Sequence, residues 1–167
     1  MLRIVCTWQP WPFGWIARKF GLRWSHAFLL RTLEDGRHIV YEATARGIWK
    51  HPLKPGDLGH EHRVYVTKKP LEDWQRERII GCAEGMCGKP YNYFLLLRLA
   101  WRILKNFLGF KPKQAFMAPA EVCSSFVQNC YWVAGIDLVP GQAALPDDLA
   151  NSPLVKEVGT IQFPTGT

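Results

Sequence analysis

The chain has 167 residues, of which 48% are hydrophobic and 21% charged. This balance indicates one globular domain over residues 1–167 and excludes a disordered or low-complexity protein. The net charge of +7 suits a polyanionic partner such as an anionic membrane or a cell-wall polymer. Because the basic residues are scattered and no nucleic-acid-binding signature is present, we do not expect nucleic acid as a partner.

The five cysteines form no C-x-x-C pair and are odd in number. This pattern predicts reduced thiols, with neither a disulfide framework nor a structural zinc site, and we expect no metal or other cofactor. The N-terminal apolar run is interrupted early by Gln9, Pro10 and Pro12, unlike a secretory signal peptide. We therefore expect a protein that is cytoplasmic when it is synthesised.

Strand signals lie mainly before Pro70. Apolar, β-branched or alternating runs predict strands at residues 2–7, 24–31, 37–43, 63–67 and 154–163. The second and third of these flank Asp35-Gly36, a strong hairpin signal. Residues 45–60 contain several prolines and glycines and predict a loop.

The loop of this hairpin determines whether His26 can meet Glu42. A two-residue loop pairs Leu29 with Glu42 and places His26 on the opposite face of the sheet. A three-residue loop with a left-handed Gly36 pairs Phe28 with Glu42 and makes His26 its diagonal neighbour. The sequence leaves both registers open. The competing interpretation is that Glu42 is a solvated strand residue and that His26 is an ordinary core or surface histidine.

Helical spacing begins after Pro70. Residues 71–87, with Trp74 and Ile79 among the apolar positions, predict a first helix. Residues 93–108 predict a second, apolar helix with one stripe of basic residues. This helix is too short and too charged to span a bilayer, but it can lie against a membrane or a partner, or be buried with one wet edge.

A third helix is predicted at residues 122–134, ending at Gly135. Its apolar positions at helical spacing are Val122, Phe126, Cys130 and Val133. Cys123 then lies in the first turn, where unpaired backbone N–H groups and the helix dipole favour a thiolate. A reactive nucleophile and a buried structural cysteine are both compatible with this stretch.

Several short motifs follow one another along the chain: Trp-Ser-His-Ala-Phe-Leu-Leu at 24–30, Val-Tyr-Glu-Ala-Thr-Ala-Arg-Gly-Ile at 40–48, Gly-Lys-Pro-Tyr-Asn-Tyr at 88–93, Val-Cys-Ser-Ser-Phe-Val at 122–127 and Leu-Pro-Asp-Asp-Leu-Ala-Asn-Ser-Pro at 145–153. Their order resembles that of the circularly permuted NlpC-type papain-like hydrolases, the YiiX-like group. The resemblance extends over residues 2–163. It implies an α+β, circularly permuted papain-like fold, with an antiparallel sheet packed against the three predicted helices.

The resemblance also implies a catalytic triad. Cys123 corresponds to the nucleophile, His26 to the base and Glu42 to the group that orients the base. The backbone N–H of Cys123 is the expected oxyanion donor. Residues expected to contact the substrate are Tyr91, Ser124 and Trp24.

The function implied by this resemblance is that of a cysteine peptidase or amidase acting on peptidoglycan peptides. A phage tail is an expected setting, with other phage tail proteins as partners, and residues 93–108 are the expected site of any peripheral membrane contact. A lipid acyltransferase or thioesterase of the lecithin-retinol acyltransferase type, and an inactive module of a larger assembly, are the alternatives. In the hydrolase, the cysteines expected to be dispensable are Cys6, Cys82, Cys87 and Cys130.

Overall fold

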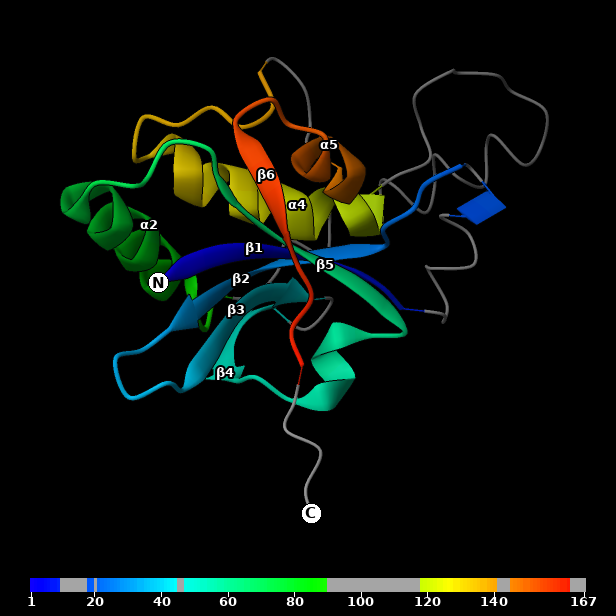
Figure 1. The fold of residues 1–167 in the computed structure, drawn as a ribbon, viewed down its shortest axis with the longest axis horizontal. Helices are drawn as coiled ribbons and strands as arrows, with labels where there is room; N and C mark the ends of the chain where they lie inside the picture. The colour runs from blue at the N-terminus through cyan, green and yellow to red at the C-terminus, as the bar shows by residue number, and fades with distance from the viewer. Residues whose placement is uncertain (10–17, 20, 45–46, 90–117, 141–144, 163–167) are drawn as a thin grey trace.

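The computed structural model describes residues 1–9, 18–19, 21–44, 47–89, 118–140 and 145–162 (Figure 1). Its strands are β1 (Leu2–Trp8), β2 (His26–Thr32), β3 (His38–Thr44), β4 (Gly47–Pro52), β5 (Glu61–Thr67) and β6 (Val155–Gly159). Its helices are η2, a 3₁₀ turn (Pro55–Leu58), α2 (Asp73–Met86), α4 (Ala118–Trp132) and α5 (Pro146–Ala150). The predicted helix 93–108 lies outside the described residues.

The strands form one six-stranded sheet in the order β4-β3-β2-β1-β5-β6, and each neighbouring pair is antiparallel. The last strand returns to the sheet beside β5, at the edge opposite β4. The α+β class with an antiparallel sheet is therefore confirmed.

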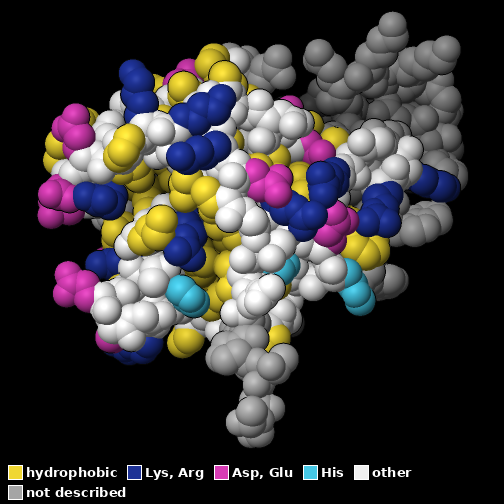
Figure 2. Space-filling model, viewed as in Figure 1, with side chains coloured by type: hydrophobic (Ala, Val, Ile, Leu, Met, Phe, Trp, Pro, Cys, Tyr) yellow, Lys and Arg dark blue, Asp and Glu magenta, His cyan; other side chains and the backbone are white. Residues whose placement is uncertain are grey.

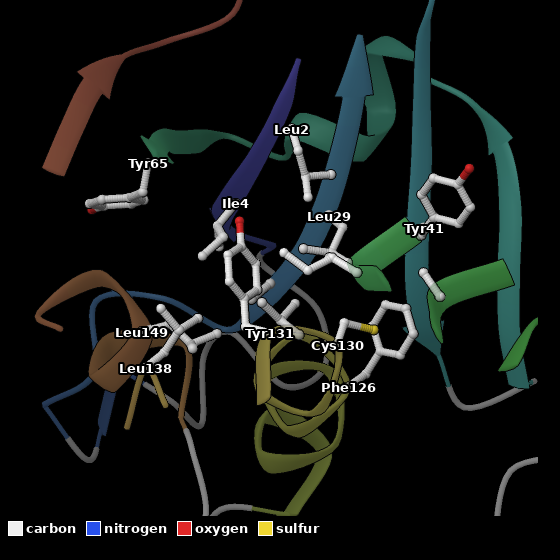
Figure 3. Close-up of a cluster of buried hydrophobic side chains, with 14 of the residues drawn as sticks. Leu2, Ile4, Leu29, Tyr41, Tyr65, Phe126, Cys130, Tyr131, Leu138 and Leu149 are labelled. Atoms are coloured by element: carbon white, nitrogen blue, oxygen red, sulfur yellow. The ribbon is translucent and has the colours of Figure 1, made fainter. Parts of the chain in front are cut away.

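The two faces of the sheet are covered differently. Helices α2, α4 and α5 lie on one face, whereas η2 lies on the other (Figure 1). The larger core forms under the helices, and its side chains from the sheet and from α4 and α5 include Leu2, Ile4, Leu29, Tyr41, Phe126, Cys130, Tyr131 and Leu149 (Figure 3). The smaller cluster on the other face is formed by Val5, Phe28, Leu30, Val40, Leu58 and Val64.

The outer surface is mixed in charge. Lysine and arginine side chains are spread over the face seen in Figure 2, with acidic side chains and apolar patches between them. In the part of the chain that is described, no helix has the length and apolar character needed to cross a membrane.

The β2–β3 hairpin closes through three residues. Leu33 N–H donates to Arg37 O at 2.8 Å, and Gly36 between them has φ 82°. The strands pair Leu29 with Tyr41, and the same register continued by one residue places Phe28 opposite Glu42. The three-residue register is therefore confirmed, and it puts His26 and Glu42 on one face of the sheet.

Gly36→Ala should lower the free energy of unfolding by about 1 kcal/mol, because a Cβ disfavours the left-handed conformation. A Cβ at this position would meet no atom within 4 Å, so the cost comes from the backbone alone. Urea denaturation of both variants measures the difference. The matched control is Gly56→Ala, where φ is not positive and the space is also open; equal losses in the two variants would contradict the prediction.

Three local predictions are wrong. Residues 45–60 are not all loop, because β4 pairs with β3 and places Pro52 at its end, where a missing N–H is tolerated at a sheet edge. Trp74 on α2 and Val133, which directly follows the last residue of α4, do not face the core; their exposed fractions are 48% and 38%. The buried positions of α2 are Ile79 and Ala83, which lie four residues apart on one face.

Candidate active site

His26 and Glu42 form a direct contact across the hairpin. His26 is the first residue of β2, and its Nε2 lies 2.8 Å from Oε2 of Glu42 on β3. Their side chains are only 14% and 17% exposed. The contact is therefore a largely buried hydrogen bond, which is stronger and less screened than a pair on the surface.

Cys123 approaches His26 from α4, the helix that packs on β2 and β3. Its side chain is buried, with 1% exposed. Burial lowers the pKa of His26. The charges of Cys123 and Glu42, and the hydrogen bonds that His26 makes with both, outweigh burial and raise that pKa to about 10. At neutral pH His26 is therefore an imidazolium, placed between the side chain of Cys123 and the carboxylate of Glu42.

The carboxyl group of Glu42 is held in its ionised form. Burial raises its pKa, yet the hydrogen bonds and charges of His26 and of a second histidine, His51, outweigh burial and hold the pKa below its usual range. Glu42 thus remains a carboxylate that accepts from His26 Nε2, which leaves Nδ1 as the ring nitrogen for Cys123.

The start of α4 corrects the prediction for the surroundings of Cys123. The helix begins at Ala118, four residues before the predicted start, so Cys123 lies in its second turn. Pro119 is compatible with this earlier start, because proline is tolerated in the first turn of a helix. The N–H of Cys123 is then not among the unpaired groups of the helix start. The helix terminus therefore does not supply the expected oxyanion donor, and the cation beside Cys123 is the imidazolium of His26.

Of the residues expected to contact a substrate, the two that the structure describes are buried. Trp24 and Ser124 are buried, with 2% and 0% exposed, and Trp24 belongs to the large core. Tyr91 lies outside the described residues. Neither described side chain offers open surface to a substrate.

Helix α5 fixes the segment that enters β2. The carboxylate of Asp147 accepts from the backbone N–H of Arg23 at 2.9 Å and from that of Trp24 at 3.0 Å. The two donor residues, Arg23 and Trp24, lie three and two positions before His26 in the chain. A short helix near the C-terminus therefore helps to set the position of the candidate base.

Sequence reasoning missed His51. Its Nε2 lies 3.1 Å from Oε1 of Glu42, the oxygen that His26 does not use. The prolines and glycines of 45–60 predict a loop at this position, and Ile48-Trp49 is a weak strand signal beside them. The candidate site therefore contains two histidines, one on each side of the carboxylate.

Three of the other cysteines are held in the neutral form. Burial raises the pKa of the Cys6, Cys87 and Cys130 thiols. Cys6 also lies close enough to Cys123 for the charge of Cys123 to raise its pKa further. These thiols have the environment of structural cysteines rather than nucleophiles.

No protein-family model and no curated protein matches this sequence. The fold is similar to a crystal structure described as metalloprotein YiiX from Escherichia coli O157:H7, with a TM-score of 0.66 and 15% sequence identity. The match covers 95% of this chain and 96% of that chain. At this identity the similarity shows the fold alone.

The description of YiiX as a metalloprotein raises the question of a metal in this chain. Among the residues that the structure describes, no group of three or more His, Cys, Asp or Glu side chains could hold a metal ion. Both oxygens of Glu42 are already within hydrogen-bond distance of imidazoles. The described residues thus do not fit a metal centre, and the similarity to YiiX confirms, at the level of the fold, the resemblance to the YiiX-like group that the sequence motifs predict.

Proposed function

We propose that this chain is a circularly permuted NlpC-type papain-like cysteine hydrolase. The observation that carries the proposal is the placement of His26 between Cys123 and Glu42, with the 2.8 Å bond to Glu42 on one side and the hydrogen bond with Cys123 on the other. Nucleophile, base and orienting group in this order are the arrangement that activates a cysteine for acyl transfer.

In the proposed reaction, the thiolate of Cys123 attacks the substrate carbonyl carbon and forms a thioester as the bond to the leaving group breaks. His26 gives its proton to the departing amine. A water molecule then loses a proton to His26 and attacks the thioester, which releases the acid and restores the thiolate and imidazolium. Glu42 remains ionised throughout and keeps Nε2 of His26 in place.

We propose peptide amides of peptidoglycan as the substrate class. The net charge of +7 favours association with an anionic cell-wall polymer, although it does not select a bond. The test is to incubate the full chain and Cys123→Ala with purified muropeptides and, in parallel, with acyl phospholipids, and to identify products by mass. Cleaved muropeptides with the wild-type chain alone support the proposal. Acyl products instead would favour a lipid acyltransferase or thioesterase, and an unreactive wild type in both arms would favour an inactive module.

Glu42→Gln should lower kcat by about tenfold, because the amide oxygen still accepts from His26 but no longer bears the charge that stabilises the imidazolium. KM should change little, since Glu42 acts on His26 rather than on the substrate. Steady-state kinetics measure both values. The control is Glu157→Gln on β6, which removes an ion pair with Arg63 elsewhere on the sheet; unchanged kcat in Glu42→Gln would remove Glu42 from the triad.

A further inference from the structure

The carboxylate of Glu42 lies between two imidazoles that come from different strands. Oε2 is 2.8 Å from Nε2 of His26, and Oε1 is 3.1 Å from Nε2 of His51. The side chain of His51 is 23% exposed and that of Glu42 is 17% exposed. Each oxygen of one carboxylate thus has its own nitrogen donor.

The sheet register produces this arrangement on both sides of β3. On β4, Trp49 pairs with Glu42, so His51 two residues later is the diagonal neighbour of Glu42 on the same face. On β2, His26 stands in the corresponding diagonal relation, because the register places Phe28 opposite Glu42. Glu42 is therefore the middle of three strand residues whose side chains converge on one face.

Both ring nitrogens of His51 face acceptors. Besides Nε2 at Glu42, Nδ1 lies 2.9 Å from the carbonyl oxygen of Pro52 and 3.7 Å from Oδ2 of Asp57 on η2. A neutral imidazole has one N–H, so only the imidazolium can donate at both nitrogens. Burial lowers the pKa of His51, but the carbonyl of Pro52 and the carboxylates of Glu42 and Asp57 outweigh it and raise that pKa above its ordinary value.

These contacts give an alternation of charges from α4 to η2. The carboxylates of Glu42 and Asp57 alternate with the imidazoles of His26 and His51, and Cys123 lies beside His26 at the α4 end. Glu42 therefore lies between two imidazoles, and His51 lies between two carboxylates. A carboxylate held at only one oxygen can rotate about its terminal bond, whereas one held at both oxygens is fixed.

We propose that His51 is a positioning residue, which holds Oε1 of Glu42 so that Oε2 stays directed at His26. This proposal rests on the proposed function, in which His26 must keep one orientation between Cys123 and the substrate. His51 touches neither the thiol nor the reacting atoms in this scheme. It acts through Glu42.

The test compares His51→Ala, His51→Gln and His38→Ala in the full chain. The readout is the rate at which iodoacetamide labels Cys123 at pH 6, which needs no known substrate. His51→Ala should lower this rate by about tenfold, because a charge-assisted hydrogen bond to Glu42 is lost. His51→Gln should stay within about threefold of wild type, since its side-chain amide keeps one donor. His38 is the control, because it lies on β3 like Glu42 but its Nδ1 is 3.0 Å from Oγ1 of Thr32 on β2. His38→Ala should leave the rate unchanged.

Added imidazole provides a readout that a purely structural role would not move. It should restore most of the labelling rate of His51→Ala, because the site is partly open at His51, and it should not affect His51→Gln. A wild-type rate in His51→Ala would overturn the proposal. Equal losses in both His51 variants without rescue by imidazole would also overturn it and would indicate a structural role.

Nitrogen NMR of the histidine rings tests the proposal apart from reactivity and without any variant at His51. Two protonated ring nitrogens on His51 at pH 6, with Nε2 perturbed in Glu42→Gln, are expected. A neutral His51 with an unprotonated Nε2 would contradict the proposal. If wild-type Cys123 labels no faster than an ordinary thiol, the hydrolase function fails, whereas the NMR result still decides whether His51 holds Glu42.

Discussion

Replacement of Cys123 by alanine should reduce turnover by at least about 10⁴-fold, the scale on which enzymes of this type depend on their nucleophile. The physical reason is that the thioester cannot form without the sulfur of Cys123, the thiol that is hydrogen-bonded with His26. Product formation from the substrate identified with the wild-type chain measures the effect. Circular dichroism should be unchanged, because the substitution removes one atom from a buried position.

Two further variants separate the nucleophile from a general effect of cysteine loss. Cys87→Ala removes a thiol at the C-cap of α2 that donates to the carbonyl of Ala83, and it should retain wild-type turnover. Cys123→Ser should be nearly as inactive as Cys123→Ala, because an alcohol is a far weaker nucleophile than a thiolate near neutral pH. Full activity in Cys123→Ser would indicate that another group performs the attack.

Replacement of His26 by alanine should reduce iodoacetamide labelling of Cys123 at pH 6 by about 100-fold. His26, with its pKa of about 10, remains an imidazolium at every pH below that value and loses its proton only as the pH rises through it. In the proposed mechanism this cation keeps Cys123 ionised, so wild-type labelling should be nearly constant from pH 6 to 9. An ordinary cysteine without a charged partner is only about 0.3% ionised at pH 6, so the variant should gain about tenfold per pH unit toward pH 8.

The control for this experiment is His60→Ala, which removes an exposed histidine that contacts the ring of Trp8. Its labelling profile should match the wild type. Mass spectrometry after proteolysis assigns the label to Cys123 and separates it from the other four cysteines. A His26→Ala profile equal to that of the wild type would show that the imidazolium does not stabilise the thiolate.

Part of this architecture could be predicted from local sequence signals. The hairpin is the clearest case, because Gly36 permits a left-handed turn and the alternation of apolar residues then fixes which face each strand residue occupies. Given the three-residue loop, the meeting of His26 and Glu42 follows from the side-chain period of two. The approximate end of α4 could also be predicted, because a glycine often adopts the left-handed conformation after a helix, and Gly135, three residues after Trp132, has φ 77°.

Other features depended on partners that are distant in sequence. Strand β4 has weak local propensity, and it forms because β3 offers it unpaired backbone groups, so His51 reached Glu42 through pairing that composition alone did not predict. The packing of α2 on the core left Trp74 exposed, and α4 ended before Val133, so both side chains are exposed although their spacing fitted an apolar stripe.

The sequence by itself determined the α+β class, the hairpin and the choice of Cys123, His26 and Glu42 as candidate site residues. Turn residues, the alternation of side chains along a strand and the order of motifs can all be identified from the sequence. Only the tertiary structure decided that Cys123 lies in the second turn of its helix, that His26 is held as an imidazolium, and that Glu42 is held from both sides. The reason is that burial and charge act through space: the pKa of His26 depends on groups from α4 and β3, which lie 97 and 16 residues away along the chain.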